Sequence, residues 1–241
     1  MDAAVSSTPS PASPLPEVLN TLEARVLGCL IEKELSTPEY YPLSLNALVN
    51  ACNQKNNRDP VLLLSARDVE VTLDGMRQRR LAGLFAGADA RVPKFKHTLD
   101  LVLPMEVPDR AVLAELLLRG PQTGGELRGR CERMFAFGGV DQVEEVLARL
   151  AARPAGAVVR HLPRQPGQKE ARWAQILTGE PSPAAETSSP AAAGAASTGA
   201  PPPLTAQIRL APEAEARFAA LEAEVARLSA ELEKLRQSLG G

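Results

Sequence analysis

Residues 65–86, SARDVEVTLDGMRQRRLAGLFA, decide the fold. Val69, Leu73 and Met76 recur at the spacing of one helix face, and Ser65 stands at the N-cap position. The strand-like run Leu81–Ala86 follows at once. A Gly/Ala/Asp tip at 87–90 and a second run over 94–103 complete the pattern, which predicts a helix that leads directly into a β-hairpin.

The same pattern recurs 74 residues later, where Val143, Leu147, Leu150 and Val158 repeat Val69, Leu73, Met76 and Leu84. Two helices are expected before each copy. In the first copy they start after Asn20, with Glu23 as its capping-box partner and an end near Ser36, and after Ser44. In the second copy the helices are expected at 109–119, 123–135 and 140–153, and the strands at 157–162 and 171–177.

Three helices followed by a hairpin is the order of a winged helix, a variant of the helix-turn-helix. The fold class predicted is therefore α+β, mainly α, with two winged-helix domains in tandem, although other small α+β folds share this element order. The expected domains are a disordered tail at 1–18, winged helices at 19–104 and 105–180, an Ala/Pro-rich flexible linker at 181–205, and a coiled-coil helix at 206–241.

The last of these segments alternates apolar spacings of three and four, as the a and d positions of a coiled coil do. A parallel register would pair Arg217 with Glu222 and Glu231 with Arg236. We expect a homodimer; a helix docked on its own chain and a frayed single helix are the alternatives. The candidate dimerisation residues are Phe218, Leu221, Val225, Leu228, Leu232, Leu235 and Leu239.

Composition excludes several classes of function. The chain has 241 residues and a formal charge of −2, and neither a membrane span nor a signal peptide is recognisable, so a cytoplasmic location is expected. Three widely spaced cysteines, expected to be reduced core residues, and two histidines supply no metal-site spacing. Because no phosphate-binding loop, dinucleotide fingerprint or nucleophile motif is present, we expect no enzyme activity and no cofactor.

Several long strings of the sequence resemble the YceH-like family of bacterial proteins. They are PLSLNALVNACNQK (42–55), NRDP (57–60), RVPKFKH (91–97), RGPQT (119–123), GELR (125–128) and LPRQPGQKEAR (162–172). The resemblance covers roughly residues 19–178. It implies a tandem winged-helix fold and leaves the biochemical activity open.

In DNA-binding winged helices the third helix enters the major groove and the hairpin, or wing, contacts phosphates. The candidate nucleic-acid residues follow from this geometry. In the first domain they are Arg77, Arg79 and Arg80 at the third helix and Arg91, Lys94, Lys96 and His97 at the wing; in the second domain they are Arg164, Lys169 and Arg172 at the wing. Solvated hairpin charges that discourage edge pairing are the structural alternative. The third helix of the second domain begins with carboxylates, which repel phosphate but also suit a helix N-terminus.

The amides and basic residues of 46–58 either read base edges or cap helices and build turns. Trp173 is expected in the core. The sequence favours a dimeric protein that binds double-stranded DNA, a property that suits a transcriptional regulator. The alternative is an adaptor whose winged helices bind a protein partner without DNA, which the near-zero net charge also fits.

Overall fold

The chain is a mixed α+β protein, described here by a computed structural model over residues 17–85, 92–164, 168–180 and Arg227. We call residues 19–104 the first half and 105–180 the second half. The first half holds α1 (Thr21–Ser36), the 3-10 turn η1 (Pro38–Tyr40), β1 (Leu43–Ser44), α2 (Leu45–Cys52), α3 (Ala66–Gln78), β2 (Ala82–Phe85), β3 (Lys94–His97) and η2 (Leu99–Leu101). The second holds α4 (Val107–Arg119), α5 (Gly124–Cys131), α6 (Val140–Ala151), β4 (Val159–Leu162) and β5 (Arg172–Gln175).

Capping side chains start the helices where the sequence predicts them. Asn20 accepts the backbone N–H of Glu23, whose carboxylate accepts that of Asn20, both at 2.8–2.9 Å. Ser44 caps α2, and Ser65 and Thr123 form capping boxes at α3 and α5. These local bonds satisfy backbone donors that have no partner within the helix.

Each half carries a small antiparallel sheet. In the first half the strand order is β1-β3-β2, with Leu43 opposite Phe95 and Ala82 opposite His97. In the second half β4 pairs with β5, and Gln122 adds an isolated bridge to Trp173 on the other side of β5. The two-residue strand β1 was not predicted, because two residues carry no alternation.

Strand and helix ends differ from the sequence prediction in several places. The strand expected over 94–103 stops at His97, because β2 begins at Ala82 and offers no partner beyond it. The chain turns instead through η2, which buries Leu99. The helix expected to reach residue 135 ends at Cys131, and the turn after it places Met134 and Phe137 in the core.

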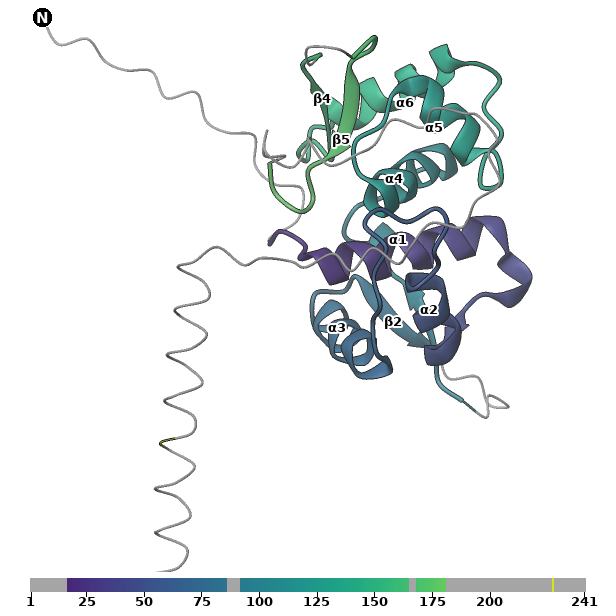
Figure 1. Ribbon diagram of the computed structural model, residues 1–241, viewed down its shortest axis with the longest axis vertical. Helices are drawn as coiled ribbons and strands as arrows, with labels where there is room; N and C mark the ends of the chain where they lie inside the picture. The colour runs from purple at the N-terminus through teal and green to yellow at the C-terminus, as the bar shows by residue number, and fades with distance from the viewer. Residues whose placement is uncertain (1–16, 86–91, 165–167, 181–226, 228–241) are drawn as a thin grey trace, which may run out of the picture. The chain divides into compact units, whose positions relative to one another are not determined.

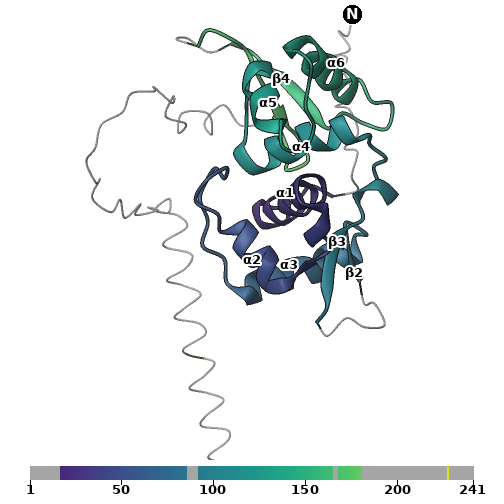
Figure 2. The same ribbon diagram turned by 90° about the vertical axis from the view of Figure 1, so that its right-hand side faces the viewer.

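The two halves meet through α1 and α4, which pack against each other in the middle of the structure (Figures 1 and 2). One continuous apolar core contains residues from both halves, including Leu30 and Leu118. Backbone hydrogen bonds also cross between them: Leu19 N–H donates to the Leu177 carbonyl at 2.7 Å, and Asp59 N–H to the Leu118 carbonyl at 2.8 Å.

Gly28 lets these helices approach closely. A Cβ atom at this position would lie 2.9 Å from Leu118 Cγ and 3.1 Å from Leu117 Cβ, both on α4. The three cysteines are free and buried, as expected of core residues.

Some expectations fall outside the described residues: the N-terminal tail up to residue 16, the hairpin tip at 87–90 with the neighbouring Arg91, the linker and the seven candidate dimerisation residues at 218–239. Within the described part of the chain, no helix combines the length and apolar character needed to cross a membrane.

Replacing Gly28 with Ala should destabilise the protein by about 1–3 kcal/mol, because the added methyl group overpacks the contact between α1 and α4. Gly75 is the matched control, since a Cβ there meets no atom within 4 Å. Gly75→Ala should stabilise α3 by about 0.5–1 kcal/mol through helix propensity. Urea unfolding measures both; an equal gain from the two substitutions would contradict the close helix contact.

Candidate functional site

The three arginines predicted at the end of α3 as nucleic-acid contacts have different surroundings. Arg77 is exposed and pairs with Asp74 at 3.1 Å. Arg79 is bound to Glu23 of α1 at 2.7 Å, and its guanidinium also donates to the carbonyl of Glu17. Arg79 is therefore committed to holding the start of α1 against the end of α3.

His97 is a buried structural residue. It is 5% exposed, its Nε2 lies 2.8 Å from a carboxylate oxygen of Glu34, and its backbone N–H donates to the Tyr41 hydroxyl at 2.7 Å. These contacts join β3 to α1 and to the segment before β1. The side chain is thus turned away from solvent and from any ligand that approaches the hairpin.

The remaining predicted cations of the first half form what we call the basic stripe, Arg80, Lys94 and Lys96. Lys94 and Lys96 share one face of β3, since the residues between and after them, Phe95 and His97, are buried. Thr98 continues that face, and its hydroxyl donates to the Arg80 carbonyl at 2.7 Å. Arg80 and Lys96 are exposed, and no stripe residue forms an ion pair within 4 Å in the described chain, although Lys96 is within electrostatic range of Glu34.

The second-half candidates do not join this stripe. Arg172 donates to the Pro121 carbonyl at 2.8 Å and lies 3.3 Å from Glu126, while Arg164 and Lys169 are exposed. The β4–β5 pair and the β2–β3 pair lie at opposite ends of the described region, on either side of α1 and α4 (Figures 1 and 2). The two predicted basic clusters are therefore separate surfaces.

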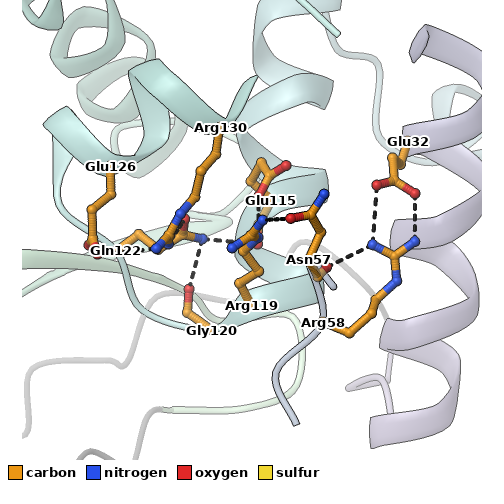
Figure 3. A network of polar contacts seen from close by, with 9 residues as sticks. All are labelled: Glu32, Asn57, Arg58, Glu115, Arg119, Gly120, Gln122, Glu126 and Arg130. Atoms are coloured by element: carbon orange, nitrogen blue, oxygen red, sulfur yellow. Dashed lines mark hydrogen bonds and ion pairs between the residues drawn. The ribbon is translucent and has the colours of Figure 1, made fainter. Parts of the chain in front are cut away.

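A buried polar network between the halves was not predicted as a site (Figure 3). At its first-half end, the fully buried side chain of Arg58 donates two hydrogen bonds to the Glu32 carboxylate, at 3.1 and 2.6 Å. Its Nε also donates to the Ala51 carbonyl at 3.0 Å. Arg58 thereby fixes the loop that follows α2 onto α1.

Asn57 carries the network across to the second half. Its carbonyl accepts a bond from Arg58 at 2.7 Å, and its side-chain oxygen accepts one from Arg119 on α4. Asn57 has a φ of 62°, a left-handed conformation that asparagine tolerates better than most residues. The amide-rich segment thus builds a turn here, which is one of the two roles that its composition allows.

The second-half end of the network surrounds Glu115 of α4. This carboxylate is 5% exposed and lies 3.1 Å from Arg119 Nε, and Arg130 of α5 donates to the Gln122 side chain at 2.6 Å. Burial raises the pKa of Glu115 to about 7, against the lowering effect of Arg119. Glu115 therefore changes charge near neutral pH.

The two α+β halves, joined by this buried polar network, belong to a chain that matches one family over most of its length. A family described as "Protein of unknown function, DUF480" matches residues 19–168. The UPF0502 proteins of Geotalea daltonii, Geobacter sulfurreducens and Aeromonas hydrophila are 54%, 51% and 46% identical over 206, 211 and 226 residues. These alignments cover 86%, 88% and 92% of this chain and 88%, 90% and 96% of those proteins.

The chain therefore belongs to the DUF480/UPF0502 family of bacterial proteins, whose function is not established. This confirms the resemblance to the YceH-like family.

Removing Arg58 should be costly. Arg58→Ala removes both hydrogen bonds from the buried Glu32 carboxylate and leaves it with Lys33, 3.3 Å away; we expect the free energy of unfolding to fall by about 3 kcal/mol. Arg77→Ala is the control, because it breaks an exposed pair and should change stability by less than about 1 kcal/mol. Chemical denaturation distinguishes the two; comparable small losses would show that the Glu32–Arg58 pair is not structural.

Glu115 should make stability depend on pH. Its folded pKa of about 7 exceeds its ordinary value of 4.5, so the stability it contributes is present at low pH and is lost as the pH rises through about 7. Glu115→Gln removes this loss. Relative to the wild type, its unfolding free energy should rise by about 3 kcal/mol between pH 4 and pH 8. Glu145→Gln, at an exposed carboxylate, is the control; a pH-independent difference for Glu115→Gln would refute the assignment.

Proposed function

We propose that this protein binds double-stranded DNA, that each half is a winged helix, and that the first half makes the contact. The element order supports the winged-helix interpretation: α1, α2, α3 and the β2–β3 pair in the first half, and α4, α5, α6 and the β4–β5 pair in the second. In this interpretation α3 is the helix that enters the major groove, and β2–β3 belong to the wing.

The observation that carries the proposal is the basic stripe. Arg80 follows the end of α3, and Lys94 and Lys96 lie on the strand that returns from the hairpin. Cations at the junction of a recognition helix and its wing are placed to contact phosphates on both sides of a groove. None of the three forms an ion pair within 4 Å in the described chain, and Glu34, the acid within electrostatic range of Lys96, is bound to His97, so the stripe is available for such contacts.

The exposed face of α3 supports a modest role in reading bases. Arg67 and Gln78 are side chains able to hydrogen-bond base edges, and Val71, 63% exposed, is able to contact a thymine methyl group. Glu70 and Asp74 share that face and limit its affinity for phosphate. We infer that affinity comes mainly from the stripe.

The second half favours a different kind of partner. Asp141 and Glu145 are exposed on α6, and the exposed Arg149 of the same helix pairs with Asp109. An open groove of about 850 Å³ beside α6 is lined by residues 151–157, β4 and Trp173. The groove is lined by Arg153, Arg160 and His161 and by no carboxylate. The alternative function, an adaptor that binds another protein, would therefore use the exposed Asp141 and Glu145 of α6, because carboxylates repel DNA but suit a basic protein surface.

The pairing of two chains through the heptads at 218–239 stays a prediction. A homodimer would present two basic stripes to one duplex, and the linked second contact would increase affinity through effective concentration.

The test is fluorescence anisotropy of the full chain on a random 30-base-pair duplex at about 50 and 200 mM salt. We expect micromolar binding that weakens strongly with salt. The triple variant Arg80→Ala, Lys94→Ala, Lys96→Ala should bind at least about tenfold more weakly, and the log–log salt slope should become shallower by about 2 to 3.

The matched control removes three exposed cations from the second half: Arg128→Ala, Arg164→Ala, Lys169→Ala. It should retain most of the affinity. Equal losses in the two triple variants would indicate attraction to net charge rather than a defined face. Absence of binding at 50 mM salt would reject DNA binding and favour the adaptor.

A further inference from the structure

A cavity of about 130 Å³ lies beside the buried polar network, where elements of both halves meet. The end of α1, the loop after α2, α4 and the segment at the end of α5 form its walls. Its charged lining residues are Lys33, Arg130, Arg133, Glu32 and Glu115, and its neutral polar lining residues are Ser36, Thr37, Gln54 and Asn57.

The charges around this cavity do not balance. Three cations and two carboxylates line it, and the guanidinium groups of Arg58 and Arg119 lie directly behind, each hydrogen-bonded to Asn57. Glu126 pairs with Arg130 at 3.4 Å and Lys33 lies 3.3 Å from Glu32, so five positive charges stand against three negative ones. The C-terminal ends of α1 and α5 contribute about half a negative charge each, which still leaves a positive excess.

The polar groups that face the cavity are not saturated. Arg133 is exposed and has no ion-pair partner in the described chain, and the side-chain amide nitrogen of Asn57 donates to none of the described residues. Donors thus remain available for a ligand that accepts hydrogen bonds.

We propose that this cavity binds the phosphate group of a small anion. Arginine and lysine side chains, hydroxyl groups and a side-chain amide are the groups that recognise phosphate oxygens. The volume corresponds to several water molecules at about 10–15 Å³ each, so it accommodates one phosphate group but not a nucleoside. Any larger part of the ligand would lie at the mouth.

A ligand in this cavity would contact both halves at once. Lys33 and Asn57 belong to the first half, and Arg130 and Arg133 to the second. Occupancy would therefore stabilise the contact between the halves. The cavity shares no residue with the basic stripe, so this inference stands or falls independently of DNA binding.

The experiment is isothermal titration calorimetry of the full chain with inorganic phosphate, sodium sulfate and glycerol 3-phosphate at constant ionic strength. We expect saturable one-site binding and a higher thermal unfolding midpoint in the presence of phosphate. Tighter binding of glycerol 3-phosphate than of inorganic phosphate would assign the site to a phosphomonoester, and the reverse order to the free anion.

Two variants test the site: Arg133 is exposed, and Lys33 is partly exposed and lies 3.3 Å from the Glu32 carboxylate. Arg133→Ala and Lys33→Ala should each weaken binding by about tenfold or more, because each removes a charge-assisted contact. Arg128→Ala is the matched control: it removes an exposed arginine of α5 that does not line the cavity, and its affinity should equal that of the wild type. The stripe variant should also bind phosphate normally.

A pH comparison with sulfate, whose charge is constant, adds an independent readout. Glu115 faces Arg119 on its own helix, Glu32 of α1, Arg130 of α5 and Arg58 of the loop. Because its ionised form repels an anion, sulfate should bind about tenfold more tightly at pH 6 than at pH 8, and Glu115→Gln should abolish this ratio.

No heat and no change in unfolding midpoint at about 10 mM of any of the three anions would overturn the proposal. Binding that is equally tight in Arg133→Ala, Lys33→Ala and the wild type would also overturn it.

Discussion

The buried ion pair between Glu32 and Arg58 is the interaction on which the rest of the arrangement depends. It ties the loop after α2 to α1, and that loop reaches α4 through Asn57 and through the backbone bond from Asp59 to Leu118. An unpaired charge at this depth would be strongly destabilising, so neither partner is free to move away. The close contact at Gly28 and the buried polar network are therefore parts of one interface, apolar at its centre and charged at its edge.

Most helices were predictable because the information that starts them is local. Asn20 with Glu23, and Ser65 with Asp68, are capping pairs three residues apart, and the structure contains both. The strands were less predictable because their ends depend on partners far along the chain. β3 stops where β2 supplies no further partner, and β1 exists only because Phe95, 52 positions away, lies opposite Leu43.

The candidate residues show the same division between local and distant information. Exposed Arg80 and Lys96 were found from composition and position alone. Arg79 and His97 look equally basic in the sequence, yet their acidic partners lie 56 and 63 positions away, and no local pattern reveals such pairs. The buried polar network was missed for the same reason: Arg58 stands in an amide-rich turn, and Glu32 lies 26 residues before it on a helix that carries several other charged residues.

The aromatic residues give each half its own optical label. Trp173 is the only tryptophan; it lies in the second half, where its indole N–H donates to Glu144 at 3.0 Å and its ring meets His161 edge-on. Both tyrosines are in the first half, and the Tyr41 hydroxyl is bound to the β3 backbone. Tryptophan emission therefore reports on one half and tyrosine absorbance on the other. The two signals in the unmodified protein would therefore show whether its halves unfold together or one after the other.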